Sequence, residues 1–222
     1  MFKRLVLSSS AFVIITKKYL SKIFHSLTLL YFLVLVLLFS FVSFSPSEDV
    51  SSSVQLKNSA IRAIRQNIAN LYPTLEPALD DIFPKKDSSV LEAKGKDKTS
   101  FILVDGRPMF YRFRDGPYFP TLRLLHMYPD MMPSVRVDKG AIKFVLKGAD
   151  IMCPGLTSSA ADCSVELGEG APVAIFAEGK DNALATGVTK MSTADIRKIN
   201  KGVGVGVVHY IGDELWSNDS FL

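Results

Sequence analysis

Residues 134–156 read SVRVDKGAIKFVLKGADIMCPGL, and the expected fold of the chain is worked out from this stretch. Val135 and Val137 alternate with polar residues, which is the pattern of a short strand. Asp138 belongs to the residue types that cap helices, so the pattern predicts a helix over residues 139–146. A glycine two residues later is a typical end for such a helix.

The predicted helix has one basic side and one apolar side. Its basic row consists of lysines four residues apart: Lys139, Lys143 and Lys147. Its apolar side consists of Ile142, Val145 and Leu146. Basic side chains bind nucleic acid by neutralising phosphates and releasing counterions. The alternative interpretation, which the composition leaves equally open, is that the lysines are the solvated face of a short helix.

Short β-like runs follow at residues 172–177 and 183–188. Ser192 then caps a predicted helix that ends at Asn200. A glycine-rich strand is expected at 203–211, and this strand character excludes a dinucleotide-binding loop at its glycines, which would need a helix there. Several short strands with glycine turns indicate a compact barrel-like domain.

Upstream, residues 45–132 are expected to form a small α+β unit. A stripe of apolar residues predicts an amphipathic helix that the serines of 51–53 cap and Pro73 ends. The stripe consists of Val54, Ile61, Ile64, Ile68 and Leu71. A short helical turn is expected between Pro77 and Pro84. The charged segment 85–100 has no apolar period and predicts an exposed loop or a weak hairpin.

The same unit contains a clear hairpin signal. Residues 101–104 and 109–113 are rich in aromatic and aliphatic residues and flank Asp105-Gly106, a pair that suits the positive φ angles of a tight turn. Thr121 is expected to cap a short leucine-rich helix that ends by Pro129. The fold class is therefore α+β, with a small α+β domain before a barrel-like one.

The chain has 222 residues, 48% of them hydrophobic, and a formal net charge of +4. Enough apolar residues are present for a core, so a disordered or disulfide-knotted chain is excluded. Residues 1–44 contain five basic residues and no acidic one, so the remaining residues carry a net charge of −1. Within them, residues 105–147 carry +4 and residues 148–222 carry −5. The body of the protein is thus electrically polarised.

Residues 26–44 form an uncharged apolar run without Gly or Pro. As a helix the run would span a bilayer core, and the lysines before it would hold the N-terminus in the cytoplasm. A cleaved signal peptide fits less well, because the run is long. A third interpretation is a translated, unspliced intron, since the segment is dominated by residues that pyrimidine-rich codons specify.

Catalytic and metal-binding patterns are absent from the sequence. His25, His126 and His209 have no partner at a metal-binding interval. His126 is interpreted as a surface or interface residue, with RNA contact as the alternative, and His209 as a satisfied core or rim residue. The adjacent carboxylates Asp213 and Glu214 are interpreted as solvated charge. No cofactor and no metal are expected, and Cys153 and Cys163 are expected to be reduced structural thiols.

The stretch 137–156 resembles the opening of a PUA domain, an RNA-binding module of pseudouridine synthases and translation factors. Residues 172–175, 185–188 and 209–216 look like its later strands. The resemblance implies a PUA-type pseudo-barrel over residues 133–216, followed by a tail at 217–222. The segment Met152, Cys153, Pro154 and Gly155 resembles the ligand-side loop of that module, although it is equally well explained as a structural turn.

Farther upstream, residues 114–126 (RDGPYFPTLRLLH) and 83–87 (FPKKD) resemble the malignant T-cell-amplified sequence 1 family. This resemblance implies a non-enzymatic, cytoplasmic factor of the small ribosomal subunit that works with density-regulated protein. Such a factor acts in translation initiation and reinitiation, and in release of tRNA after termination. Its RNA partners would be ribosomal RNA and tRNA.

Residues 1–4 fit the start of this family and residues 44–49 fit its continuation, so residues 5–43 interrupt the match. That interruption favours the intron hypothesis, which reads of the transcript that all retain the segment would overturn. If the segment is translated, the alternative is a single-pass membrane protein whose PUA-like module binds another partner.

Two groups of basic residues are the expected RNA contacts. On the predicted helix of the PUA domain these are Lys139, Lys143 and Lys147. On the adjoining domain they are Arg112, Arg114 and Arg123.

Overall fold

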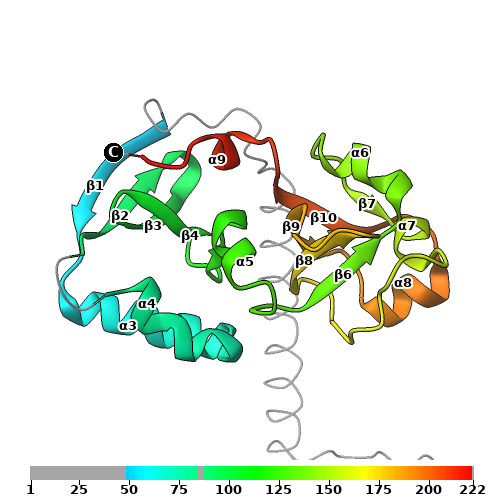
Figure 1. Cartoon of the computed structure of the whole chain (residues 1–222), viewed down its shortest axis with the longest axis horizontal. Helices are drawn as coiled ribbons and strands as arrows, with labels where there is room; N and C mark the ends of the chain where they lie inside the picture. Colours follow the sequence, from blue (N-terminus) through cyan, green and yellow to red (C-terminus); the bar gives the residue numbers. More distant parts are fainter. Residues whose placement is uncertain (1–48, 85–87, 222) are drawn as a thin grey trace, which may run out of the picture. The chain divides into compact units, whose positions relative to one another are not determined.

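The computed structural model describes residues 49–84 and 88–221, all of which belong to the unit Phe39–Leu222 (Figure 1). The apolar N-terminal helix and its membrane or intron interpretations concern residues outside these ranges. Two five-stranded sheets form the framework, and short helices accompany each of them. The fold is an α+β arrangement, as the sequence predicts.

The first sheet is antiparallel throughout and follows the order of the chain. Its strands are β1 (Val50–Gln55), β2 (Val90–Gly95), β3 (Thr99–Val104), β4 (Arg107–Phe113) and β5 (Phe119–Pro120). The predicted hairpin joins β3 and β4, where Asp105 and Gly106 have φ angles of 49° and 79°. The short 3₁₀ turn η3 (Lys96–Lys98) connects β2 to β3.

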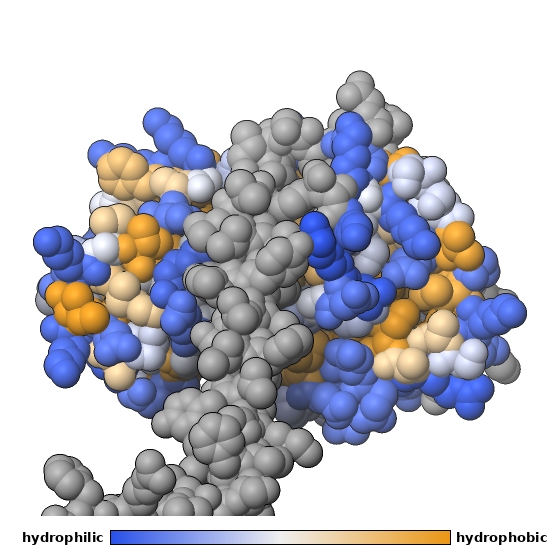
Figure 2. Space-filling model, turned by 180° about the vertical axis from the view of Figure 1, so that it is seen from behind, coloured by the Kyte–Doolittle hydropathy of each residue, from blue (hydrophilic) through white to orange (hydrophobic). Residues whose placement is uncertain are grey.

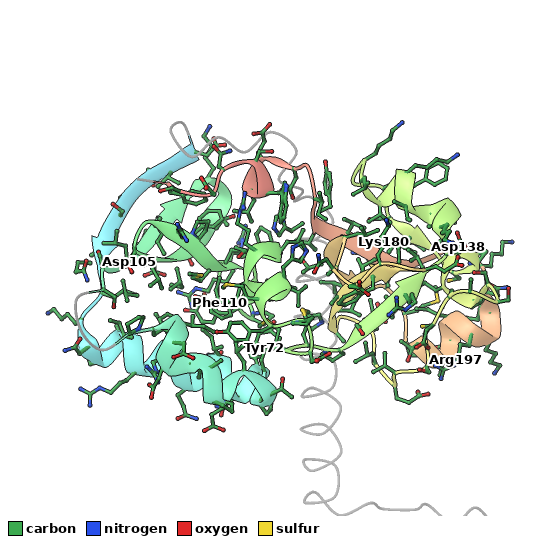
Figure 3. All side chains as sticks on the ribbon, viewed as in Figure 1. Tyr72, Asp105, Phe110, Asp138, Lys180 and Arg197 are labelled. Carbon is green, nitrogen blue, oxygen red and sulfur yellow. The ribbon has the colours of Figure 1, made fainter. Side chains whose placement is uncertain are left out.

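Helices cover one face of the first sheet. They are α3 (Asn58–Leu71), the 3₁₀ turn η2 (Pro73–Ala78), α4 (Leu79–Ile82) and α5 (Leu122–Met127). Their apolar residues, among them Ile68 and Leu79, pack with Ile102 and Phe110 in one buried cluster. Figure 3 shows Tyr72 and Phe110 between the helices and the sheet. α3 ends at Leu71 and Pro73 begins η2 two residues later, and Thr121 caps α5 by accepting a hydrogen bond from the N–H of Leu124.

Two sequence predictions in this region differ from the structure, one wholly and one in part. The predicted helix does not include Val54, because residues 50–55 form β1 and α3 begins only at Asn58. For the segment 85–100 the loop interpretation is wrong and the hairpin interpretation is confirmed, because residues 90–95 form β2, which η3 joins to the antiparallel strand β3. β2 is moreover an interior strand between β1 and β3. Pairing with neighbouring strands determines both structures, and a local propensity pattern does not contain that information.

The second sheet has the order β6-β8-β9-β10-β7. Its strands are β6 (Ser134–Val137), β7 (Ile151–Met152), β8 (Pro172–Ala177), β9 (Ala185–Thr189) and β10 (Val203–Tyr210). β6 runs parallel to β8, and the other pairs are antiparallel. Its core combines Val137, Ile151 and Ile175 with the strand residues around them.

The remaining helices are short and follow β6, β7, β9 and β10 along the chain. They are η4 (Lys139–Ala141), α6 (Ile142–Val145), α7 (Pro154–Thr157), α8 (Thr193–Ile199) and α9 (Glu214–Ser217). Ser192 caps α8 as predicted, and Asn200 ends it with a left-handed φ of 48°. The predicted helix over residues 139–146 is observed as a 3₁₀ turn that continues into one turn of α-helix.

Candidate nucleic-acid interface

A groove of about 670 Å³ lies beside the lysine row of the second sheet. Its walls come from η4 and α6 on one side and from the segment around β7 and α7 on the other. The lining residues are Asp138, Gly140, Ala141, Lys143, Phe144, Val145, Ala149, Asp150, Ile151, Met152 and Gly155. Most of this lining is apolar, and three charged side chains interrupt it.

Asp138 fixes the start of the helical wall (Figure 3). Its Oδ1 accepts a hydrogen bond of 3.0 Å from the N–H of Ala141, which confirms the predicted cap. Its Oδ2 accepts a second bond of 3.3 Å from the hydroxyl of Ser158. Both carboxylate oxygens therefore have partners within the protein, so Asp138 is a structural residue of the groove.

The three lysines of the predicted row are exposed, but they differ in position. Lys143 lines the groove, whereas Lys139 and Lys147 are not among the lining residues. Lys139 forms an ion pair of 3.5 Å with Glu178. An exposed pair of this kind contributes little stability, so the lysine can exchange its partner for a phosphate at low cost.

Phe144 is a groove residue that the sequence reasoning did not single out. Its side chain is 54% exposed, and the Nζ atom of Lys143 lies 4.9 Å from the centre of its ring. Met152 on the opposite wall is 50% exposed. Apolar side chains this large and this exposed are available to a ligand. The aromatic residue beside Lys143 was a usable signal, but a helical pattern alone does not say which apolar positions stay uncovered.

The loop predicted to face the ligand divides into two parts. Met152 and Gly155 line the groove. Cys153 is buried, and its Sγ donates a hydrogen bond of 3.4 Å to the carbonyl of Lys201. Burial raises the pKa of the Cys153 thiol, and the same cause raises that of Cys163. Both cysteines are free and structural, as the sequence predicts, and Pro154 begins α7.

The predicted arginines do not line the groove. Arg112 on β4 bonds to Glu92 at 3.1 Å, and its guanidinium lies 5.0 Å from the ring centre of Tyr118. Arg123 on α5 donates a 2.7 Å bond to the carbonyl of Trp216 and stacks on its ring. Arg114 follows β4 with a positive φ of 52°. Their role in RNA binding therefore stays a prediction, separate from the groove.

Several contacts connect residues of the first sheet and its helices to residues of the second sheet. The hydroxyl groups of Tyr111 and Thr186 lie 3.1 Å apart. His126 donates from Nε2 to the carbonyl of Ala183 at 2.8 Å, which confirms its interpretation as an interface residue. Burial raises the pKa of Tyr111, so its hydroxyl stays protonated.

His209 and Asp213 form a buried pair next to these contacts, with Nδ1 and Oδ2 2.7 Å apart. The core interpretation of His209 is confirmed. The prediction of solvated charge is wrong for Asp213, whose side chain is buried and also accepts bonds from the N–H groups of Tyr210 and Trp216. The bond from Trp216 caps α9, and together the bonds compensate the carboxylate for its lost water. Among the described residues, no group of His, Cys, Asp and Glu is suited to hold a metal ion.

Comparisons with known proteins first define the class of protein. A family model for a Pre-PUA-like domain matches residues 44–129, and a model for a PUA domain matches residues 133–211. Among solved structures, a hypothetical protein of Pyrococcus horikoshii superposes with a TM-score of 0.60 and 28% identity, covering 76% of this chain and all of that one. A PUA domain protein of Aeropyrum pernix superposes with a TM-score of 0.56 and 26% identity, covering 74% and 89%. The second sheet thus has the PUA-type fold.

Curated relatives then define the family. Malignant T-cell-amplified sequence 2 of mouse is 48% identical over 79% of this chain and 96% of its own length. A homologue of malignant T-cell-amplified sequence 1 from Dictyostelium discoideum is 49% identical over 73% and 88%. The chain therefore belongs to the malignant T-cell-amplified sequence family.

Family membership and the PUA domain support an RNA-binding role related to translation, which is typically non-enzymatic. Within the part of the chain that the structure describes, no helix is long and apolar enough to cross a bilayer.

Proposed function

We propose that this protein is a cytoplasmic, non-enzymatic translation factor that binds RNA through the groove of its PUA domain. It acts on the small ribosomal subunit in initiation and reinitiation, and in release of tRNA after termination, together with density-regulated protein. The observation that carries the proposal is the exposed pair Lys143 and Phe144 at an apolar groove.

The groove suits an unpaired nucleotide better than a duplex. The ring of Phe144 and the thioether of Met152 offer a surface on which a base can stack. An unpaired base can reach such a surface, whereas a base inside a duplex is already stacked and paired. Lys143 stands beside that surface, where it can bind the phosphate of the same nucleotide. The 3′ end of tRNA is single-stranded and has this chemistry, so we assign the groove to the acceptor end.

The other basic residues extend this surface in the proposal. Lys139 and Lys147 bind neighbouring phosphates, while Arg112, Arg114 and Arg123 face ribosomal RNA from the domain of residues 45–132.

Filter binding of deacylated tRNA over a series of salt concentrations tests the groove directly. The triple substitution of Lys139, Lys143 and Lys147 by Ala is expected to weaken binding and to reduce the slope of log affinity against log salt by about 2, or about 0.7 for each contact with a single strand. Lys94→Ala, at an exposed lysine of the first sheet, is the matched control. Unchanged affinity and slope in the triple variant would refute the assignment.

Fractionation of cell extract on a polysome gradient tests the cellular role. The protein is expected to sediment with small subunits, to leave them after nuclease treatment, and to be absent from carbonate-washed membranes. Capture of density-regulated protein by the tagged chain tests the partnership. A protein that stays with washed membranes would contradict the cytoplasmic role.

A further inference from the structure

The lining of the groove has the wrong sign for its proposed ligand. Its charged residues are Lys143, Asp138 and Asp150, so the lining carries a net charge of −1. Asp138 and Asp150 both accept hydrogen bonds, the latter at 3.0 Å from the N–H of Val207. Neutral donors of this kind orient a carboxylate without removing its charge. RNA phosphate that approaches Lys143 is therefore repelled by the carboxylates of Asp138 and Asp150, unless a cation outside the lining neutralises their charge.

Lys190 provides such a cation from the other side of β10. It follows the end of β9, where its N–H donates a 2.8 Å bond to the carbonyl of Gly204. Its side chain then crosses β10 over Gly206, because a methyl group on that Cα would overlap Cε of Lys190 and lie 2.7 Å from its Nζ. Only a residue without a side chain leaves room for this path.

The path leads towards Asp150. β7 pairs with β10 on the side opposite β9, and Asp150 directly precedes β7. Asp150 and Glu169 both stabilise the charged form of Lys190, while burial lowers the pKa of its ammonium group. A half-buried ammonium gains from a carboxylate close to it, and of these two carboxylates Asp150 is the one that lines the groove.

We infer that Lys190 is a positioning residue of the groove: it neutralises Asp150 across β10, so that RNA phosphate can approach Lys143. The inference rests on the proposed RNA-binding function. It assigns Lys190 no contact with RNA, which separates its role from that of the lysine row.

Removing the charges of the pair one after the other tests this role in the full-length protein with deacylated tRNA. Lys190→Gln is expected to weaken binding on the order of fivefold at low salt, because Asp150 then repels phosphate. Adding Asp150→Asn to that variant should restore the affinity, since an amide still accepts the bond from Val207 but carries no charge. A double variant as weak as Lys190→Gln overturns the inference.

The salt dependence of binding distinguishes a positioning residue from a phosphate contact. Lys143→Ala should reduce the slope of log affinity against log salt by about 0.7, whereas Lys190→Gln should not; an equal reduction would make Lys190 a phosphate contact and overturn the positioning role.

Gly206→Ala displaces Lys190 and should weaken binding as much as Lys190→Gln does, with no further loss of affinity when the two substitutions are combined. Additive losses contradict the proposed path.

Lys190→Arg, which keeps the charge, is the matched control and should bind tRNA like the wild type. If the wild type binds no RNA, the proposed function fails and the role of Lys190 with it. If the wild type binds RNA and Lys190→Gln leaves the affinity unchanged, only the role of Lys190 fails.

Discussion

The two sheets use their aromatic and basic residues in opposite ways. Around the first sheet the aromatic rings are buried, with Phe110 stacked on Phe83, and the guanidinium groups of Arg112 and Arg123 bond to other residues of the protein. At the groove of the second sheet Phe144 and Lys143 remain exposed. Figure 2 shows hydrophobic residues scattered among hydrophilic ones on the face that it presents.

This difference separates stability from recognition. A buried ring stabilises the fold and is closed to a ligand, and an arginine bonded within the protein has fewer donors left for RNA. An exposed ring and an exposed lysine affect the fold little and are open to a ligand. Substitutions in the first sheet should therefore change the free energy of unfolding, and substitutions at the groove should change affinity for RNA.

The largest effect is expected for Phe110→Ala. Phe110 is fully buried and belongs to the main apolar cluster, so its truncation leaves a cavity and should cost about 3–5 kcal/mol in the free energy of unfolding. Urea denaturation followed by circular dichroism measures the change. Val54→Ala on the exposed strand β1 is the control, expected within about 0.5 kcal/mol of the wild type. A similar loss in both variants would contradict the buried position of Phe110.

The buried pair of His209 and Asp213 should rank next. Asp213→Asn keeps the volume but removes the carboxylate that accepts bonds from His209 and two backbone N–H groups, so a loss of about 3 kcal/mol is expected. Glu214→Gln, at the exposed neighbour, is the matched control and should change little. Thermal unfolding at fixed pH compares the two; equal midpoints would show that Asp213 is solvated after all.

At the groove, Phe144→Ala should weaken RNA binding and leave the stability of the fold nearly unchanged. Loss of a stacking surface is expected to weaken binding of single-stranded RNA by about 1–3 kcal/mol while the free energy of unfolding stays within about 0.5 kcal/mol. Phe144→Tyr keeps a ring and should bind nearly as well as the wild type. Fluorescence anisotropy with a labelled oligonucleotide measures the affinity. An alanine variant that unfolds easily but binds normally would place Phe144 with the structural residues.

The sequence predicted those features that depend on neighbours along the chain. The caps at Thr121, Asp138 and Ser192 and the turn at Asp105-Gly106 are local, because each needs only the hydrogen bonds or φ angles of a few adjacent residues. The motif of residues 137–156 likewise led to the correct domain type, and its Lys143 lines the groove.

Features that depend on distant residues were not predictable from the sequence. The sequence did not predict β2 as an interior strand, because Glu92 and Lys94 on one of its faces are charged. Only pairing with β1 and β3 gives it that position. The burial of Asp213 depends on where α9 begins beside β10. The path of Lys190 depends on a glycine 16 residues later in the chain, which meets it only through strand pairing.

The smallest effect is expected for Arg123→Ala, and it sharpens the comparison because arginine is also a candidate RNA contact. The guanidinium donates to the carbonyl of Trp216 and lies 4.7 Å from its ring centre, contacts that together should contribute about 1 kcal/mol to the free energy of unfolding. Arg123→Lys keeps the charge but loses the planar stacking. If Arg123 is structural, both variants lower stability alike and bind RNA like the wild type. If it also contacts phosphate, alanine weakens binding more than lysine does, and the division between a stabilising first sheet and a recognising second sheet no longer holds at this residue.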